Sequence, residues 1–301
     1  MADRTETQRL FRRFIIHPVQ GAAILAVFYL FRLMPITWGS AAGSFLFRTI
    51  GPRLRSDRVA RRNLKMAFPD RSQDWIDKTV NEVWDNLGRG AGEWARVDLI
   101  DTCKPDSRVT IEGEEILSEL KESGKSIVIF SGHIANWEIS SLLLAQHDLP
   151  MVTIYRPAAI PAMEYLFRRV RGRFMADLVP KDRGQMRRIV DAVKKGKTIG
   201  MLADQKLNEG LPIPFFGRDA MTPPTPAELA VRYNCPLVPV LSERLPGCRF
   251  RYKILPPLEI PTEGSRDERV QETLVMMNKV LEDWIRERPG QWFWVHRRWP
   301  D

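Results

Sequence analysis

A histidine and a glutamate lie five residues apart in the segment SGHIANWE, which runs from Ser131 to Glu138. The β-branched run SIVIFSG just before it predicts a buried strand, and residues 136–146 have a helical pattern. On one continuous helix, five residues turn about 500°, so the two side chains would point about 140° apart. We therefore expect His133 in the turn between strand and helix, with Glu138 projecting back toward it from the first turns of the helix.

A carboxylate bonded to one imidazole nitrogen fixes the tautomer of the ring, and the other nitrogen can then take a proton from a hydroxyl. The expected position is the C-terminal end of a parallel strand, where α/β proteins commonly bind ligands. The spacing alone occurs by chance in many proteins of this length, and a packed histidine at a strand end would look the same. The residues predict a His-carboxylate pair with no nucleophile of its own.

The elements that must position this pair alternate between strand and helix along the chain. This alternation predicts an α/β fold with a largely parallel central sheet flanked by helices. Further strands are expected at residues 150–157, 197–204, 236–243 and 249–256, and helices at 73–99, 162–173, 184–195, 226–233 and 266–288. There is no internal repeat and no low-complexity linker. One catalytic domain, residues 53–301, is expected to follow an N-terminal helical region, residues 1–52.

The N-terminal region contains an apolar run, FIIHPVQGAAILAVFYLF, at residues 14–31. Its length is near the minimum for crossing a bilayer, and Pro18 and Gln20 interrupt it. The arginines before it would hold the N-terminus in the cytoplasm. We interpret the run as a membrane anchor, while a shallow interfacial helix and a buried helix remain alternatives. The basic stretch at residues 53–70 would lie near anionic headgroups.

The charge balance favours an anionic partner, because 46 Lys and Arg stand against 37 Asp and Glu, a formal net charge of +9. Anionic lipid and an acidic carrier protein both fit. No RRM, KH or zinc-finger pattern is present, which argues against nucleic acid. Cys103, Cys235 and Cys248 are odd in number and lack CxxC spacing, which argues against a disulfide framework and a zinc site.

The setting of His133 resembles the lysophospholipid acyltransferase superfamily, whose mark is His-x4-Asp or His-x4-Glu after a strand. The glutamate form with Asn-Trp before it is similar to the late lipid A acyltransferases, the lauroyl and myristoyl transferases. Other segments match that family in the same order: NLKMAFPD at 63–70, TIYRP at 153–157, RRVRGRF at 168–174, LADQKLNEG at 202–210, PFFG at 214–217, TPAELA at 225–230 and WFWVHRRW at 292–299. One departure is Asp-Gln-Lys at Asp204, where some members have Asp-x-Asp-Tyr-Gly.

The resemblance implies an O-acyltransferase of lipopolysaccharide biosynthesis at the bacterial inner membrane, with its catalytic domain on the cytoplasmic side. It would move a fatty acyl chain from acyl carrier protein, or from acyl-CoA, to a hydroxyl of a lipid A precursor, with no cofactor or metal. His133 is implied as the general base and Glu138 as its orienting partner. The candidate substrate-binding residues are Asn136, Arg156, Arg171, Asp204 and Gln205.

Either arginine could stabilise an oxyanion or bind a phosphate with paired hydrogen bonds. Asp204 and Gln205 close a predicted strand and are expected to face the same crevice as His133, although a turn cap is an equal alternative. Two other functions stay open: transfer to another lipid, such as a lysophospholipid, ornithine lipid or glycolipid, and a membrane-anchored lipid-binding protein without turnover. The length of the acyl chain, the acceptor position, the acyl donor and the oligomeric state do not follow from the sequence.

Overall fold

The structure is a computed structural model that describes residues 16–182 and 184–299. Its centre is a seven-stranded sheet with the order β1-β9-β8-β2-β5-β3-β4. The strands are β1 Val109–Glu112, β2 Val128–Ser131, β3 Met151–Tyr155, β4 Asp177–Pro180, β5 Thr198–Leu202, β8 Leu237–Leu245 and β9 Arg249–Ile254. All neighbouring pairs are parallel except β8 and β9, which are antiparallel. The α/β prediction is confirmed, and the sheet is mixed rather than uniformly parallel.

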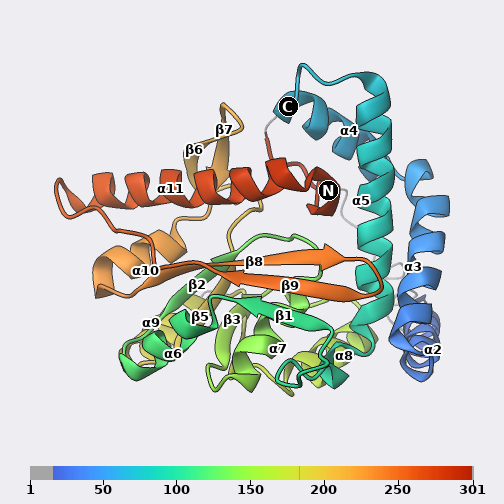
Figure 1. The fold of residues 1–301 in the computed structure, drawn as a ribbon, viewed down its shortest axis with the longest axis horizontal. Coiled ribbons are helices and arrows are strands. Elements are labelled where there is room, and N and C mark those ends of the chain that lie inside the picture. Colours follow the sequence, from blue (N-terminus) through green and yellow to red (C-terminus); the bar gives the residue numbers. More distant parts are fainter. Residues whose placement is uncertain (1–15, 183, 300–301) are drawn as a thin grey trace, which may run out of the picture.

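Two apolar clusters cover the two faces of this sheet. Successive residues of a strand point to opposite faces, and accordingly Val128 and Phe130 of β2 join one cluster while Ile129 joins the other. The helices around the sheet are α6 Glu114–Glu122, α7 Glu138–Gln146, α8 Pro161–Arg171, α9 Gln185–Lys194, α10 Thr225–Tyr233 and α11 Arg266–Glu287. Figure 1 shows α11 on one side of the sheet and α6, α7 and α8 on the other. Both faces are therefore buried, as expected for a largely parallel sheet.

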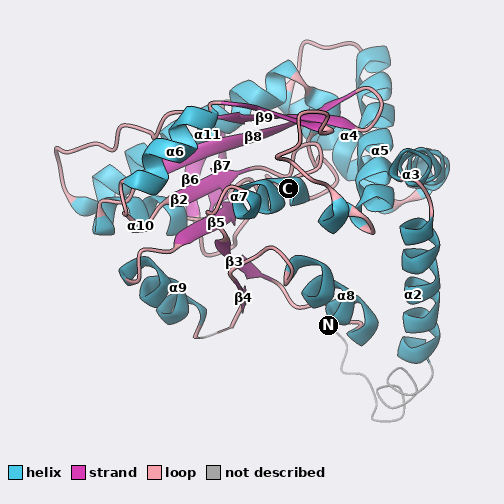
Figure 2. Ribbon diagram, turned by 60° about the horizontal axis from the view of Figure 1, so that its bottom comes forward, coloured by secondary structure: helices cyan, strands magenta, loops and turns pink. Residues whose placement is uncertain are grey.

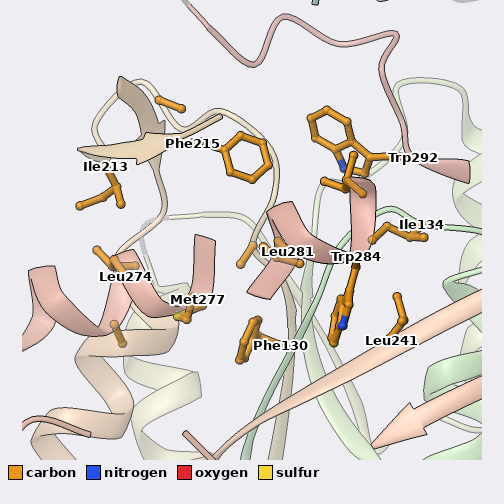
Figure 3. Packing of buried hydrophobic residues seen from close by; sticks show 14 of the residues in the cluster. Phe130, Ile134, Ile213, Phe215, Leu241, Leu274, Met277, Leu281, Trp284 and Trp292 are labelled. Carbon is orange, nitrogen blue, oxygen red and sulfur yellow. The ribbon is translucent and has the colours of Figure 1, made fainter. Parts of the chain in front are cut away.

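The long helix α11 closes one face. A capping box formed by Ser265 and Glu268 begins it, and its inward side carries Leu274, Met277 and Leu281. Figure 3 shows these side chains packed toward Phe130 of the sheet, with Phe215 and Trp292 above them. Phe215 belongs to a separate antiparallel hairpin, β6 Leu211–Phe215 and β7 Arg218–Thr222, which the sequence analysis did not predict.

The N-terminal helices stand at one end of the sheet in both ribbon views (Figures 1 and 2). They are α2 His17–Leu33, α3 Ile36–Ile50, α4 Arg55–Ala67 and α5 Gln73–Trp94. Helix α3 crosses α5 at glycines, and a Cβ atom on Gly43 would lie only 2.1 Å from the carbonyl oxygen of Gly88. A Cβ atom on Gly92 would lie equally close to the carbonyl oxygen of Gly39. The two helices therefore touch through their backbones.

The run predicted as a membrane anchor, residues 14–31, lies in α2 from His17 onward, and a short turn joins α2 to α3. Within the described part of the chain, no helix combines the length and the apolar character that crossing a bilayer requires. The start of the apolar run at residues 14–15 and the four arginines before it lie outside the described residues. The division of the chain at residue 52 stays a prediction.

Candidate active site

His133 lies in the turn between β2 and α7, as the sequence analysis predicted. Strand β5 pairs with β2 in parallel, with Ser131 opposite Leu202, and the pairing continues through a hydrogen bond from the Ala203 amide to the Ser131 carbonyl. The two strands thus end side by side. Asp204 is the second residue after β5 on this edge, 71 positions after His133 in the chain.

The imidazole of His133 is bonded to Asp204 and not to Glu138. Its Nδ1 lies 2.7 Å from Oδ1 of Asp204, and its backbone N–H donates to Oδ2 of the same carboxylate, also at 2.7 Å. The amide nitrogen of Gln205 lies 3.3 Å from the other ring nitrogen, Nε2. The structure therefore brings His133, Asp204 and Gln205 together, as expected for residues at neighbouring strand ends, but with a different carboxylate on the ring.

Asp204 is fully buried, and the indole N–H of Trp292 donates to its Oδ2 at 2.6 Å. Burial alone would raise the pKa of this carboxyl group. The charge and hydrogen bonds of His133 outweigh that effect, so the pKa lies well below its ordinary value. Asp204 is therefore a carboxylate at neutral pH, held by three N–H donors of the protein. It was expected to bind substrate, and the structure turns it toward His133 instead.

Glu138 is the first residue of α7 and pairs with Arg171, the last residue of α8. Arg171 donates from Nε to Oε2 at 2.9 Å and from one Nη to Oε1. The predicted hydrogen bond between Glu138 and His133 is thus wrong in this structure. A planar guanidinium donates two parallel N–H groups to a carboxylate, and therefore matches it better than one ring nitrogen does. Ala135, which lies between His133 and Glu138 in the chain, adopts a left-handed φ of 51°.

Asn136 links the His133 turn to α5 and β9 through hydrogen bonds. Its side chain is buried and donates to Glu93 of α5 at 2.8 Å, while its carbonyl accepts from the hydroxyl of Tyr252. Burial opposes ionisation of Glu93, but the charge of Arg244 and the hydrogen bonds around it keep the pKa of Glu93 below its ordinary value. The side chain of Asn136 therefore bonds within the protein, where a substrate contact was expected.

The other candidates fall outside this group. Arg156 follows β3 and is exposed, and β3 is separated from β2 by β5.

Two aromatic rings that the sequence analysis did not assign to His133 lie against it, Trp137 at 5.0 Å and Phe293 at 5.7 Å between ring centroids. Trp137 stands within the Asn-Trp-Glu signature, so its place in the motif was the available signal. Across the described residues, no group of three or more His, Cys, Asp or Glu is arranged to hold a metal ion.

Comparison with known proteins places the chain in a family. Residues 10–301 match the family described as bacterial lipid A biosynthesis acyltransferase. The chain is 26% identical over 257 residues to the lipid A biosynthesis palmitoleoyltransferase of Escherichia coli K12, covering 81% of this chain and 78% of that protein. It is 25% identical over 253 residues to the lauroyltransferase of the same organism, covering 81% and 79%.

A solved structure is also similar, the 1-acyl-sn-glycerophosphate acyltransferase PlsC from Thermotoga maritima, with a TM-score of 0.39 and 15% identity over 86% of this chain and 100% of that one. That similarity is too low to carry an argument. The family match over nearly the whole chain is sufficient by itself, and this chain belongs to the bacterial lipid A biosynthesis acyltransferase family, whose members transfer acyl chains to lipid A precursors.

Proposed function

We propose that His133 is the general base of this acyltransferase and activates a hydroxyl of the lipid A precursor. The observation that carries the proposal is the bond between Nδ1 of His133 and a buried carboxylate, which leaves Nε2 as the nitrogen that can accept a proton. His133 is partly exposed, so this nitrogen is within reach of a substrate. The resemblance to the His-x4-Glu acyltransferases supports the same role.

The reaction then proceeds in two steps. The acceptor oxygen attacks the thioester carbonyl of the donor while Nε2 takes the hydroxyl proton, and a tetrahedral oxyanion forms. The oxyanion collapses, the carbon–sulfur bond breaks, and the departing thiolate takes the proton back from the imidazolium. The products are the ester and the free thiol of the carrier. The amide of Gln205, beside Nε2, is our candidate for hydrogen bonding to the reacting oxygen atoms.

Glu138 and Arg171 serve this reaction as a second unit. A carboxylate that occupies Nε and one Nη of a guanidinium leaves N–H groups on the other Nη free to donate. We propose that Glu138 fixes Arg171 so that these donors meet a phosphate of the lipid A precursor or the oxyanion. Arg156 is exposed and stays a weaker candidate for the same task.

The donor and the location complete the proposal. An acidic acyl carrier protein fits the formal charge of +9, and we propose it as the donor in preference to acyl-CoA. Helices α2 and α3 expose large apolar side chains, among them Leu33, Trp38 and Phe45, which are 83%, 70% and 73% exposed. We propose that these side chains enter the cytoplasmic leaflet of the inner membrane.

The test is acyl transfer by the purified protein, with labelled acyl carrier protein and a lipid A precursor as substrates. His133→Ala should lower kcat by at least about 10²-fold with little change in melting temperature, because one positioned base contributes about 10²- to 10⁴-fold. Replacing acyl carrier protein by acyl-CoA in the same assay tests the donor. A His133→Ala protein that transfers at a near-normal rate would defeat the proposal.

A further inference from the structure

We infer that Asp204 is the positioning carboxylate of His133, in place of the motif glutamate, and that Trp292 holds Asp204 in that role. The effect on rate rests on the proposed function of His133. The arrangement itself can be tested without any substrate.

The first argument is the number of donors around Asp204. Oδ1 accepts from Nδ1 of His133, while Oδ2 accepts from the backbone N–H of His133 and from the indole N–H of Trp292. Asp204 is thereby bonded to both the main chain and the ring of one residue. This fixes the position of the ring as well as its tautomer, with the proton on Nδ1.

The second argument comes from the opposite side of the ring. The amide nitrogen of Gln205 lies 3.3 Å from Nε2 of His133, and an amide N–H can donate to that atom only when Nε2 carries no proton. The neighbours on both sides of the imidazole therefore require the same tautomer, with Nε2 unprotonated.

Trp292 brings a distant part of the chain into this arrangement. Its side chain is fully buried, and its backbone forms a β-bridge with Ile134, the residue after His133. The residue just before it, Gln291, accepts a hydrogen bond from the Ala135 amide. The segment around Trp292 thus fixes the His133 turn through its backbone and Asp204 through its indole.

Asp204→Asn makes the inference testable, because an asparagine offers one oxygen and one NH₂ group to three donors. The two donors at the Oδ2 position select the amide oxygen there. The NH₂ group then faces Nδ1 of His133, which must become an acceptor, so the ring proton moves to Nε2. The variant protein would keep the ring in place but hold it in the tautomer that cannot act as a base.

The experiment is ¹⁵N NMR of the imidazole nitrogens in the full-length protein, prepared in detergent with labelled histidine. The chain has four histidines, so His133→Ala identifies the signals of interest. In the unsubstituted protein, the neutral ring of His133 should carry its proton on Nδ1. Asp204→Asn should move it to Nε2, and Glu138→Gln, the matched control, should leave it on Nδ1.

A proton on Nε2 in the unsubstituted protein would overturn the inference, even if Asp204→Asn fails to fold. So would a tautomer change in Glu138→Gln but none in Asp204→Asn. Trp292→Phe is the milder variant: it should keep the tautomer, since Asp204 still accepts from Nδ1, but should speed exchange of the Nδ1 proton with water. Unchanged exchange in Trp292→Phe would remove Trp292 from the inference.

The kinetic outcome separates this inference from the proposed function. Asp204→Asn should lower kcat by about 10²- to 10⁴-fold, with a much smaller change in KM. If the tautomer changes as expected while His133→Ala still transfers acyl groups normally, the positioning role stands and the general-base role fails. If His133→Ala is inactive and the tautomer of Asp204→Asn is unchanged, the opposite holds.

Discussion

The two ends of the segment from His133 to Glu138 are held by different chemistry. At the first end, a fully buried carboxylate, Asp204, receives three N–H groups and contacts the histidine directly. At the second end, Glu138 receives a guanidinium that retains free N–H groups. The first arrangement suits the fixing of a ring, and the second suits a charge that must meet a substrate. The spacing between a histidine and a carboxylate therefore does not by itself assign the role of the carboxylate.

Combining substitutions tests this difference most strongly. In a His133→Ala background, Asp204→Asn should change kcat by less than about threefold, since there is no ring left to orient. Glu138→Gln in the same background should lower kcat further, by about the factor that it costs alone. Steady-state kinetics of the unsubstituted protein, Glu138→Gln, His133→Ala and the two double variants measure both effects. If Glu138→Gln left kcat unchanged in the His133→Ala background while Asp204→Asn lowered it, Glu138 rather than Asp204 would be the carboxylate that orients His133.

Removal of Arg171 should act on stability at the second end. Arg171→Met leaves Glu138 buried without its cation and should lower the free energy of unfolding by about 3 kcal/mol. Adding Glu138→Met should restore most of the loss, because an apolar pair of similar volume needs no counter-charge. Urea denaturation of both variants gives the comparison. An undiminished midpoint for Arg171→Met alone would contradict a closely bonded pair.

Acid should act on the first end through Asp204. Because its pKa is lowered in the folded protein, the folded state binds fewer protons than the unfolded state near the ordinary aspartate value of 3.8. The stabilisation is therefore complete above that value and is lost as the pH falls below it. The difference in unfolding free energy between the unsubstituted protein and Asp204→Asn should shrink from pH 6 to pH 3. Asp219→Asn, which removes an exposed carboxylate of β7, is the control.

The smallest effect on stability is expected from a substitution at Ala135, which lies between His133 and Glu138. Ala135 holds a left-handed backbone conformation, with φ at 51°, which costs an L-residue roughly 1–2 kcal/mol relative to glycine. Ala135→Gly should therefore raise the melting temperature slightly or leave it unchanged, despite the added freedom of the unfolded chain. Calorimetry would measure the shift. A clear fall would mean that the methyl group of Ala135, which is buried, contributes packing that outweighs the strain.

The sequence predicted what depends on neighbouring residues and missed what depends on strand order. The β-branched runs and helical spacings located β2, β3, β5, β8, β9 and most of the helices, and they placed His133 in a strand-to-helix turn. The partner of His133 depends on β5 lying beside β2, which no local pattern states. The rule that strand ends meet at one edge had brought Asp204 near, but its task was assigned to Glu138 through the motif.

The missed strands have equally physical reasons. Strand β1 is four residues long, and β6 contains two prolines, so neither has a clear alternating pattern. The opposite direction of β9 follows from its short connection to β8 through Pro246 and Gly247, a hairpin link that the strand prediction did not use. The segment at residues 292–299 was matched as a motif, while its contact with Asp204 required a fold in three dimensions.

The glycine crossing of α3 and α5 fixes the distance between these two helices. Peptide groups have one size whatever the sequence, so where backbone meets backbone no change of rotamer can alter the spacing. Helix α3 carries Trp38 and Phe45 outward, and α5 carries Glu93 beneath the His133 turn. With α3 in the leaflet as proposed, the height of the reacting hydroxyl above the lipid surface becomes a constant of the fold. This height would then be the same for every acyl chain that the enzyme transfers.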